Sequence, residues 1–224
     1  MPAKRSIKRR VQSSKGRGRS AFWSKYGSLI IICSIVAVLG FETYRTIKRE
    51  IVAPLVETFA EPFPQKLPSS SLTETQHASL KSKLERFADR IGGGQAADPV
   101  QLSADEINSL IEHDSDLRNQ MAVLIYGDTL YLKVSIPMEN WGFKNKYLNG
   151  HGAFSVALIE GGLDIRLLNL KVGERNLPED MMRELRLENL AGEATEDPSV
   201  RRLISSLQDL SVRNGRLVLE PRIL

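Results

Sequence analysis

The chain has 224 residues, of which 42% are hydrophobic and 26% are charged, and it contains one cysteine. This composition excludes collagen-like, disulfide-framework and wholly disordered proteins. The formal net charge of +4 is unevenly distributed, because residues 1–25 hold nine Lys or Arg and no acid, whereas the remainder holds 22 basic and 27 acidic residues. The part after residue 25 is therefore acidic, and we expect no nucleic-acid partner.

The basic tail, residues 1–25, ends at an uncharged run of 16 residues, Tyr26–Phe41. A helix over this run is roughly 24 Å long, and aromatic residues on both sides can lie in the membrane interfaces. Residues 26–44 are therefore predicted to be a transmembrane signal anchor. A cleaved signal peptide is the main alternative, because Val38–Gly40 resembles a cleavage site, and a mitochondrial presequence is a minor one.

The excess of positive charge before the predicted span sets its orientation. Lys and Arg are retained on the cytoplasmic side of a membrane, so the N-terminus is expected in the cytoplasm. The protein is then a single-pass protein of the cell (inner) membrane, with its C-terminal domain in the periplasm or another extracytoplasmic compartment of a bacterial envelope. The residues assigned to membrane orientation are Arg9, Arg10, Arg17, Arg19 and Lys25.

Residues 45–71 contain four prolines and a run of three serines, which is typical of a stalk. Residues 72–94 are predicted to be a helix, Leu72–Ile91, followed by a Gly linker. Ser71 and Glu74 have the spacing of a capping box for this helix. Its apolar stripe either packs on the domain or forms an oligomeric coil.

Residues 95–224 form the predicted extracytoplasmic domain. Apolar side chains alternate with a period of two in paired segments that are joined by short turns rich in Gly, Asn or Asp, as in antiparallel hairpins. We expect an α+β fold with an antiparallel, curved sheet of about six strands in three hairpins, packed with helices. The hairpins pair 121–126 with 129–136, 153–159 with 163–172, and 210–213 with 216–220.

Local signals add detail to this domain. Ser103 and Glu106 form a second capping box, and Pro178 and Pro198 each mark the start of a helix. Leu168 and Leu170 fall out of phase with the preceding alternation, which predicts a bulge in that strand.

No catalytic, cofactor or metal site is predicted. The chain has three histidines, His77, His113 and His151, and none is paired with another ligand at metal-binding spacing. His113 is interpreted as part of a polar helix end, and His151 as part of an entry turn over Asn149–Gly152. We therefore expect a protein that is not an enzyme; a hydrolase with a polar cleft at His113 or His151 is a minor alternative.

The connector Pro137–Leu148 is the most informative segment for binding, because aromatic side chains in a connector require burial or a partner. Trp141, Phe143 and Tyr147 are the predicted ligand or partner contacts. They could form a lid over an apolar groove, contact lipid headgroups, or cover the end of the core.

The sequence resembles the YpmS-like family of bacterial membrane-anchored proteins of unknown function. The resemblance rests on the N-terminal anchor, on Leu102–Leu110, on Tyr147–Gly150 and on Gly173–Pro178, and it covers about residues 100–220. It implies a fold similar to tubular lipid-binding domains, in which a curved sheet wraps helices around an apolar channel, and it implies no catalytic residues. The helices after Pro178 depart from that scheme.

The expected function is that of a membrane-anchored extracytoplasmic binding module that holds a lipid or other apolar ligand near the membrane. The alternative is an envelope scaffold that binds a protein partner and no small molecule. The expected partners are therefore the lipid bilayer and either an apolar ligand or an envelope protein.

Overall fold

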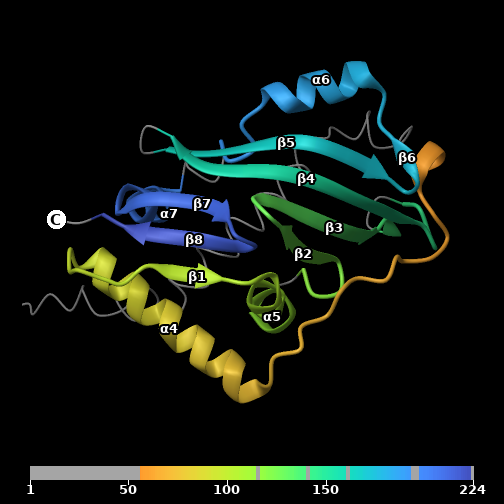
Figure 1. Ribbon diagram of the computed structural model, residues 1–224. Coiled ribbons are helices and arrows are strands. Elements are labelled where there is room, and N and C mark those ends of the chain that lie inside the picture. Colours follow the sequence, from red (N-terminus) through yellow and green to blue (C-terminus); the bar gives the residue numbers. More distant parts are fainter. Residues whose placement is uncertain (1–55, 115–116, 140–141, 160–161, 193–196, 223–224) are drawn as a thin grey trace, which may run out of the picture.

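The structure, a computed structural model, describes residues 56–114, 117–139, 142–159, 162–192 and 197–222; the predicted tail and membrane anchor lie outside these ranges. Figure 1 shows two antiparallel sheets with helices packed around them. The strands are β1 (Val100–Leu102), β2 (Met121–Tyr126), β3 (Thr129–Pro137), β4 (Tyr147–Ile159), β5 (Gly162–Val172), β6 (Arg175–Asn176), β7 (Leu207–Arg213) and β8 (Arg216–Pro221). The helices are α4 (Glu74–Gly92), α5 (Ala104–Asp114), α6 (Glu179–Leu187) and α7 (Pro198–Ser205).

The α+β class and the three hairpins are confirmed, but the strands form two sheets instead of one. The larger sheet has the order β2-β3-β4-β5-β6, and the smaller has the order β1-β8-β7. The third hairpin, β7–β8, pairs with β1 and lies with β7 against β4 (Figure 1). It does not extend the larger sheet.

Two asparagine side chains bond to strand backbone on opposite sides of the larger sheet. The Asn108 amide, on α5, bonds to the backbone N–H and C=O of Val123 in β2 at 2.7 and 2.9 Å. On the opposite side, the Asn189 amide accepts from Ile165 N and donates to Leu163 O, in a part of β5 that β6 does not cover. Each amide takes the place of a neighbouring strand, so further strand addition at these positions is blocked.

The Asn-Gly turn of the third hairpin also links the two sheets. Asn214 and Gly215 have φ angles of 52° and 73°, and a type I′ turn requires a positive φ at both positions. Gly215 N donates to Gly127 O at 2.8 Å, and Asn214 N donates to Asp128 Oδ1 at 3.1 Å. The tip of the third hairpin is therefore bonded to the tip of the first.

The second hairpin contains the predicted bulge. Ala153 pairs with Asn169 and Phe154 with Leu167, so Leu168 has no opposite residue in β4. The extra residue explains the change of phase in the sequence.

Strand β4 begins at Tyr147, six residues earlier than predicted, so the interpretation of Asn149–Gly152 as an entry turn is wrong. Gly150 and Gly152 lie within the strand. A Cβ atom at Gly152 would be 2.7 Å from the Phe154 ring, and one at Gly150 would be 3.2 Å from Lys171 O. These glycines therefore provide space for their neighbours and do not mark a turn.

Helix α4 is capped by Thr73 and Gln76, and not by Ser71 and Glu74 as predicted. The Ser71 hydroxyl is instead bonded to Asp105 on α5. The second predicted box is confirmed: the Ser103 backbone N–H donates to Glu106 Oε2 at 2.8 Å, and Glu106 N donates to Ser103 Oγ at 3.2 Å.

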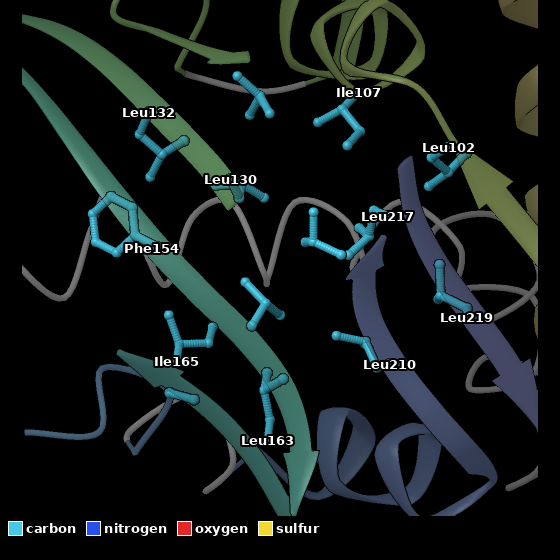
Figure 2. Packing of buried hydrophobic residues seen from close by; sticks show 14 of the residues in the cluster. Leu102, Ile107, Leu130, Leu132, Phe154, Leu163, Ile165, Leu210, Leu217 and Leu219 are labelled. Atoms are coloured by element: carbon cyan, nitrogen blue, oxygen red, sulfur yellow. The ribbon is translucent and has the colours of Figure 1, made fainter. Parts of the chain in front are cut away.

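The core is one cluster of buried apolar side chains to which both sheets and helices α4 to α7 contribute. The apolar stripe of α4 lies in this cluster, so α4 packs on the domain. Figure 2 shows Leu130, Phe154 and Ile165 of the larger sheet on one side of the core and Leu210 and Leu217 of the smaller sheet on the other. The interior between the sheets is thus lined on both sides by apolar side chains.

Replacing the buried Asn108 by alanine tests its role at the β2 edge. The Asn108→Ala variant leaves the N–H and C=O of Val123 without these partners, so we expect the free energy of unfolding to fall by about 2 to 4 kcal/mol. Urea unfolding of the purified chain, followed by circular dichroism, measures this loss. Asn169→Ala, at an exposed position of β5, is the matched control and should change stability by less than about 0.5 kcal/mol; equal effects of the two substitutions would contradict the assignment.

Candidate functional site

The predicted contact residues lie where the N-terminal segment meets the domain. Phe143 is half-buried and packs against a small cluster formed by Val56 and Met138. Tyr147 forms an antiparallel bridge with Glu61, with N–O distances of 2.8 and 2.9 Å. The structure therefore brings Phe143 and Tyr147 together at the contact with residues 56–61, whereas Trp141 lies outside the described residues, as do Arg9, Arg10, Arg17, Arg19 and Lys25.

Backbone hydrogen bonds hold the described part of the connector in a compact loop. Met138 N donates to Lys146 O at 2.9 Å, and Phe143 N donates to Met138 O at 3.1 Å. Asn145 has a left-handed φ of 54°, which Asn tolerates better than most residues. The ring of Phe143 is thereby placed against the chain's own N-terminal segment.

The buried side chain of Asn149 is the centre of this contact. Its Oδ1 accepts from Ser135 Oγ at 2.8 Å and from Gln65 N at 3.2 Å. Its Nδ2 donates to Glu61 Oε2 and, at 2.9 Å, to Phe63 O. An amide offers two acceptor and two donor positions, and all four are used here.

Gln65 and Gly173 complete the contact, which we call the Asn149 dock (Glu61, Phe63, Gln65, Ser135, Asn149 and Gly173). Gln65 Nε2 donates to the carbonyl oxygens of Val134 in β3 and Gly150 in β4. Gly173 has a φ of 59°, and a Cβ atom there would lie 2.8 Å from Glu61 Oε1. Glycine therefore serves both the backbone conformation and the fit of the Glu61 carboxylate.

A second contact joins the same segment to α5. Ser70 N donates to Glu112 Oε1, and Ser71 N donates to Asp105 Oδ1, each at 2.8 Å. The Ser71 hydroxyl donates to Asp105 Oδ2. Residues 56–73, most of which were expected to be a free stalk, thus contact the domain at both ends of the segment.

The Asp105 carboxyl has a shifted pKa. Partial burial raises its pKa, but the hydrogen bonds from the hydroxyl and backbone N–H of Ser71, and from Ser70, outweigh burial and hold the pKa below the ordinary value. The charged form of Asp105 is therefore the one that binds the segment.

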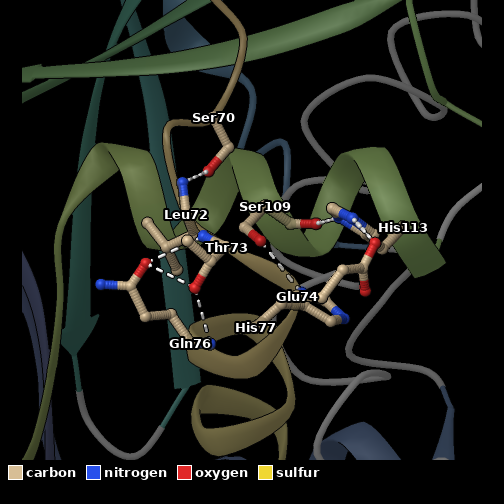
Figure 3. A network of polar contacts seen from close by, with 8 residues as sticks. All are labelled: Ser70, Leu72, Thr73, Glu74, Gln76, His77, Ser109 and His113. Carbon is tan, nitrogen blue, oxygen red and sulfur yellow. Dashed lines mark hydrogen bonds and ion pairs between the residues drawn. The ribbon is translucent and has the colours of Figure 1, made fainter.

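A cluster of polar side chains lies at the contact of α4 with α5 (Figure 3). The His77 and His113 rings are stacked, with centroids 4.3 Å apart. His77 Nδ1 lies 2.9 Å from Ser109 Oγ, His113 Nδ1 donates to Ser109 O at 2.8 Å, and His113 Nε2 lies 3.5 Å from the Glu74 carboxylate. The cluster ties the first turns of α4 to α5.

The serine and histidine in this cluster are close enough for nucleophilic catalysis, but their burial argues against it. Ser109 has an exposed fraction of 0%, so a substrate carbonyl cannot approach its hydroxyl. The sequence alone did not place His77 in this polar cluster. Its position nevertheless predicts burial, because His77 continues the buried stripe of α4 at the same three- and four-residue spacing.

The remaining candidates for chemistry are isolated. His151 lies in β4 with Lys133 and Lys171 opposite it on the neighbouring strands. Among the described residues, no group of three or more His, Cys, Asp or Glu side chains is arranged to hold a metal ion.

Comparisons with known proteins give no relative for this chain: no protein-family model, no curated protein and no solved structure matches it significantly. Within the ranges that the structure describes, no helix has both the length and the apolar character needed to cross a membrane.

An Asn149→Asp substitution tests the dock with almost no change of shape. The carboxylate cannot donate to Glu61 Oε2 or Phe63 O, and it adds a negative charge beside the Glu61 carboxylate. We expect residues 59–66 to leave the domain, with amide hydrogen exchange in this segment at least about tenfold faster and stability lower by about 2 to 4 kcal/mol. Asn169→Asp, at an exposed strand position, is the control; unchanged exchange in 59–66 would show that Asn149 does not hold the segment.

A Ser71→Ala substitution tests the second contact through its dependence on pH. The pKa of Asp105 is lower in the folded chain than its ordinary value of 3.8, so the carboxylate stabilises the folded state above that pH, and this contribution is lost as the pH falls through the folded value. We expect Ser71→Ala to lower stability by about 1 kcal/mol at pH 7, and the difference from the native chain to close as the pH falls below 3.8. Melting temperatures between pH 7 and pH 3 measure it. The control is Ser69→Ala at an exposed position; a difference that is constant with pH would argue against the role of Asp105.

Proposed function

We propose that this chain is a single-pass membrane protein whose extracytoplasmic domain is a binding module held in a defined orientation above the bilayer. The observation that carries the proposal is the Asn149 dock. A proline-rich stalk that is free along its length lets a domain turn in any direction, whereas a segment bound at Glu61, Phe63 and Gln65 fixes one end of the domain toward the anchor.

The topology follows from the sequence. The nine basic residues of the tail precede the uncharged run Tyr26–Phe41, and this arrangement keeps the tail in the cytoplasm. Figure 1 shows the docked segment at the end of the domain where β3 and β4 are connected, and the end of β8 at the opposite end. The C-terminal end of the domain accordingly points away from the membrane.

Of the two kinds of binding module, the scaffold is the better supported. Leu130, Phe154 and Leu217 belong to one cluster of buried side chains, and an acyl chain between the sheets would have to displace such contacts. The exposed Leu168 and Leu187, by contrast, lie on the outer side of β5 and at the end of α6, where a protein partner can bind them. We therefore favour an interaction with an envelope protein over a carried lipid, and over hydrolysis at the buried Ser109.

The topology can be tested on the full chain expressed with a C-terminal epitope. We expect alkaline carbonate to leave the chain in the membrane fraction, and the epitope to be accessible only from the extracytoplasmic side. The control variant replaces Arg9, Arg10, Arg17, Arg19 and Lys25 by Glu, which removes the charge bias and should send a large share of the chains into the opposite orientation. Release by carbonate, or a mature chain shortened by cleavage near residue 40, would refute the anchor.

The same purified chain distinguishes scaffold from carrier. Mass spectrometry of an organic extract should find no lipid at a one-to-one ratio after exchange into detergent. Retention of a stoichiometric acyl lipid would favour the carrier.

A further inference from the structure

Phe63 lies in the sequence Pro62-Phe63-Pro64 and has an exposed fraction of 75%, the highest of the large exposed hydrophobic side chains among the described residues. Both flanking prolines are exposed as well. An aromatic ring left in water forgoes the free energy of burial, so the transfer of this ring into an apolar or interfacial environment would be favourable.

The position of this ring is fixed by bonds on both sides. The backbone of Glu61 is paired with Tyr147, the backbone N–H of Gln65 donates to Asn149 Oδ1, and the carbonyl of Phe63 itself accepts from Asn149 Nδ2. The flanking prolines restrict their own φ angles, and Pro64 also restricts the backbone of Phe63. The backbone on both sides of Phe63 is therefore fixed by the Asn149 dock, and Phe63 is not the tip of a free loop.

The ring also lies close to the predicted membrane span along the chain. Residues 45–55 separate the predicted span, which ends at residue 44, from the helical turn at Val56, which packs on Met138. This connection reaches at most about 40 Å when extended and about 17 Å when helical. The end of the domain that carries Phe63 is thus tethered near the bilayer surface.

We infer that Phe63 is an interfacial anchor that inserts into the headgroup region of the bilayer in which the chain is embedded. This inference rests on the proposed function, since it requires the membrane anchor. Aromatic side chains favour this region of a membrane. The partner is the lipid interface itself, in preference to an anionic headgroup, because the exposed charges on the segment 57–66 and on the connector 139–146 that contacts it are of both signs: Lys66, Lys144, Lys146, Glu57 and Glu139.

The test uses the full chain in vesicles of phosphatidylcholine, a zwitterionic lipid. Cys33 is replaced by alanine, and a fluorescent probe is attached to a single cysteine introduced as Phe63→Cys. The matched control is Leu187→Cys, because Leu187 is equally exposed at 74% but lies at the end of α6. We expect lipids with a quencher near the headgroup to quench the probe at position 63 several-fold more than the probe at position 187.

The outcomes separate the inference from the proposed function. If the chain stays with the vesicles in alkaline carbonate but both probes are quenched equally, the anchor exists and the insertion of Phe63 is refuted. If the chain does not stay with the vesicles, the proposed function and this inference both fail. Melting curves of both labelled variants that match the unlabelled chain confirm that neither probe perturbs the fold.

Discussion

The path of the segment 61–65 over the domain depends on one buried amide. Asn149 is inside the domain, yet its four hydrogen-bonding positions are directed to β3 and to a segment more than 80 residues earlier in the chain. A buried amide with any of these positions empty is strongly unfavourable, so the segment is bound in one register. That register places Glu61 against Gly173 and Phe63 outside, and it sets the path of the chain toward α4.

The same chemistry recurs at the sheet edges. Asn108 and Asn189 bond to strand backbone with both ends of their amides, as a neighbouring strand would. A side-chain amide has the donor and the acceptor of a peptide group, so it can satisfy a strand without continuing the sheet. Asn108 and Asn189 thus take the place of a neighbouring strand at β2 and at part of β5, and Asn149 fixes where residues 61–65 lie.

The sequence predicts those features that depend on local patterns. The hairpins appear in the sequence as an alternation of apolar and polar residues. The turn at Asn214-Gly215 appears as two residue types that tolerate a positive φ, and the bulge at Leu168 appears as a change of phase in the alternation. The sequence does not predict long-range polar contacts: nothing local distinguishes Asn149 from a turn asparagine, or Ser71 from a capping serine, because their partners Gln65 and Asp105 lie 84 and 34 residues away. Phe143 and Tyr147 contact residues 56–61, and the sequence does not predict this contact, because the composition of that segment is typical of a stalk.

The bonded hairpin tips and the Asn149 dock give the domain a mechanical direction. In Figure 1, β4 and β5 run from the docked segment toward the end of the domain where β8 ends. Tension applied between residue 56 and that far end would act along these strands, so that the rows of hydrogen bonds between them are loaded in shear and many must break together. The dock itself would yield first, because it is held by fewer bonds, and the sheet would remain folded while the segment 56–66 extends.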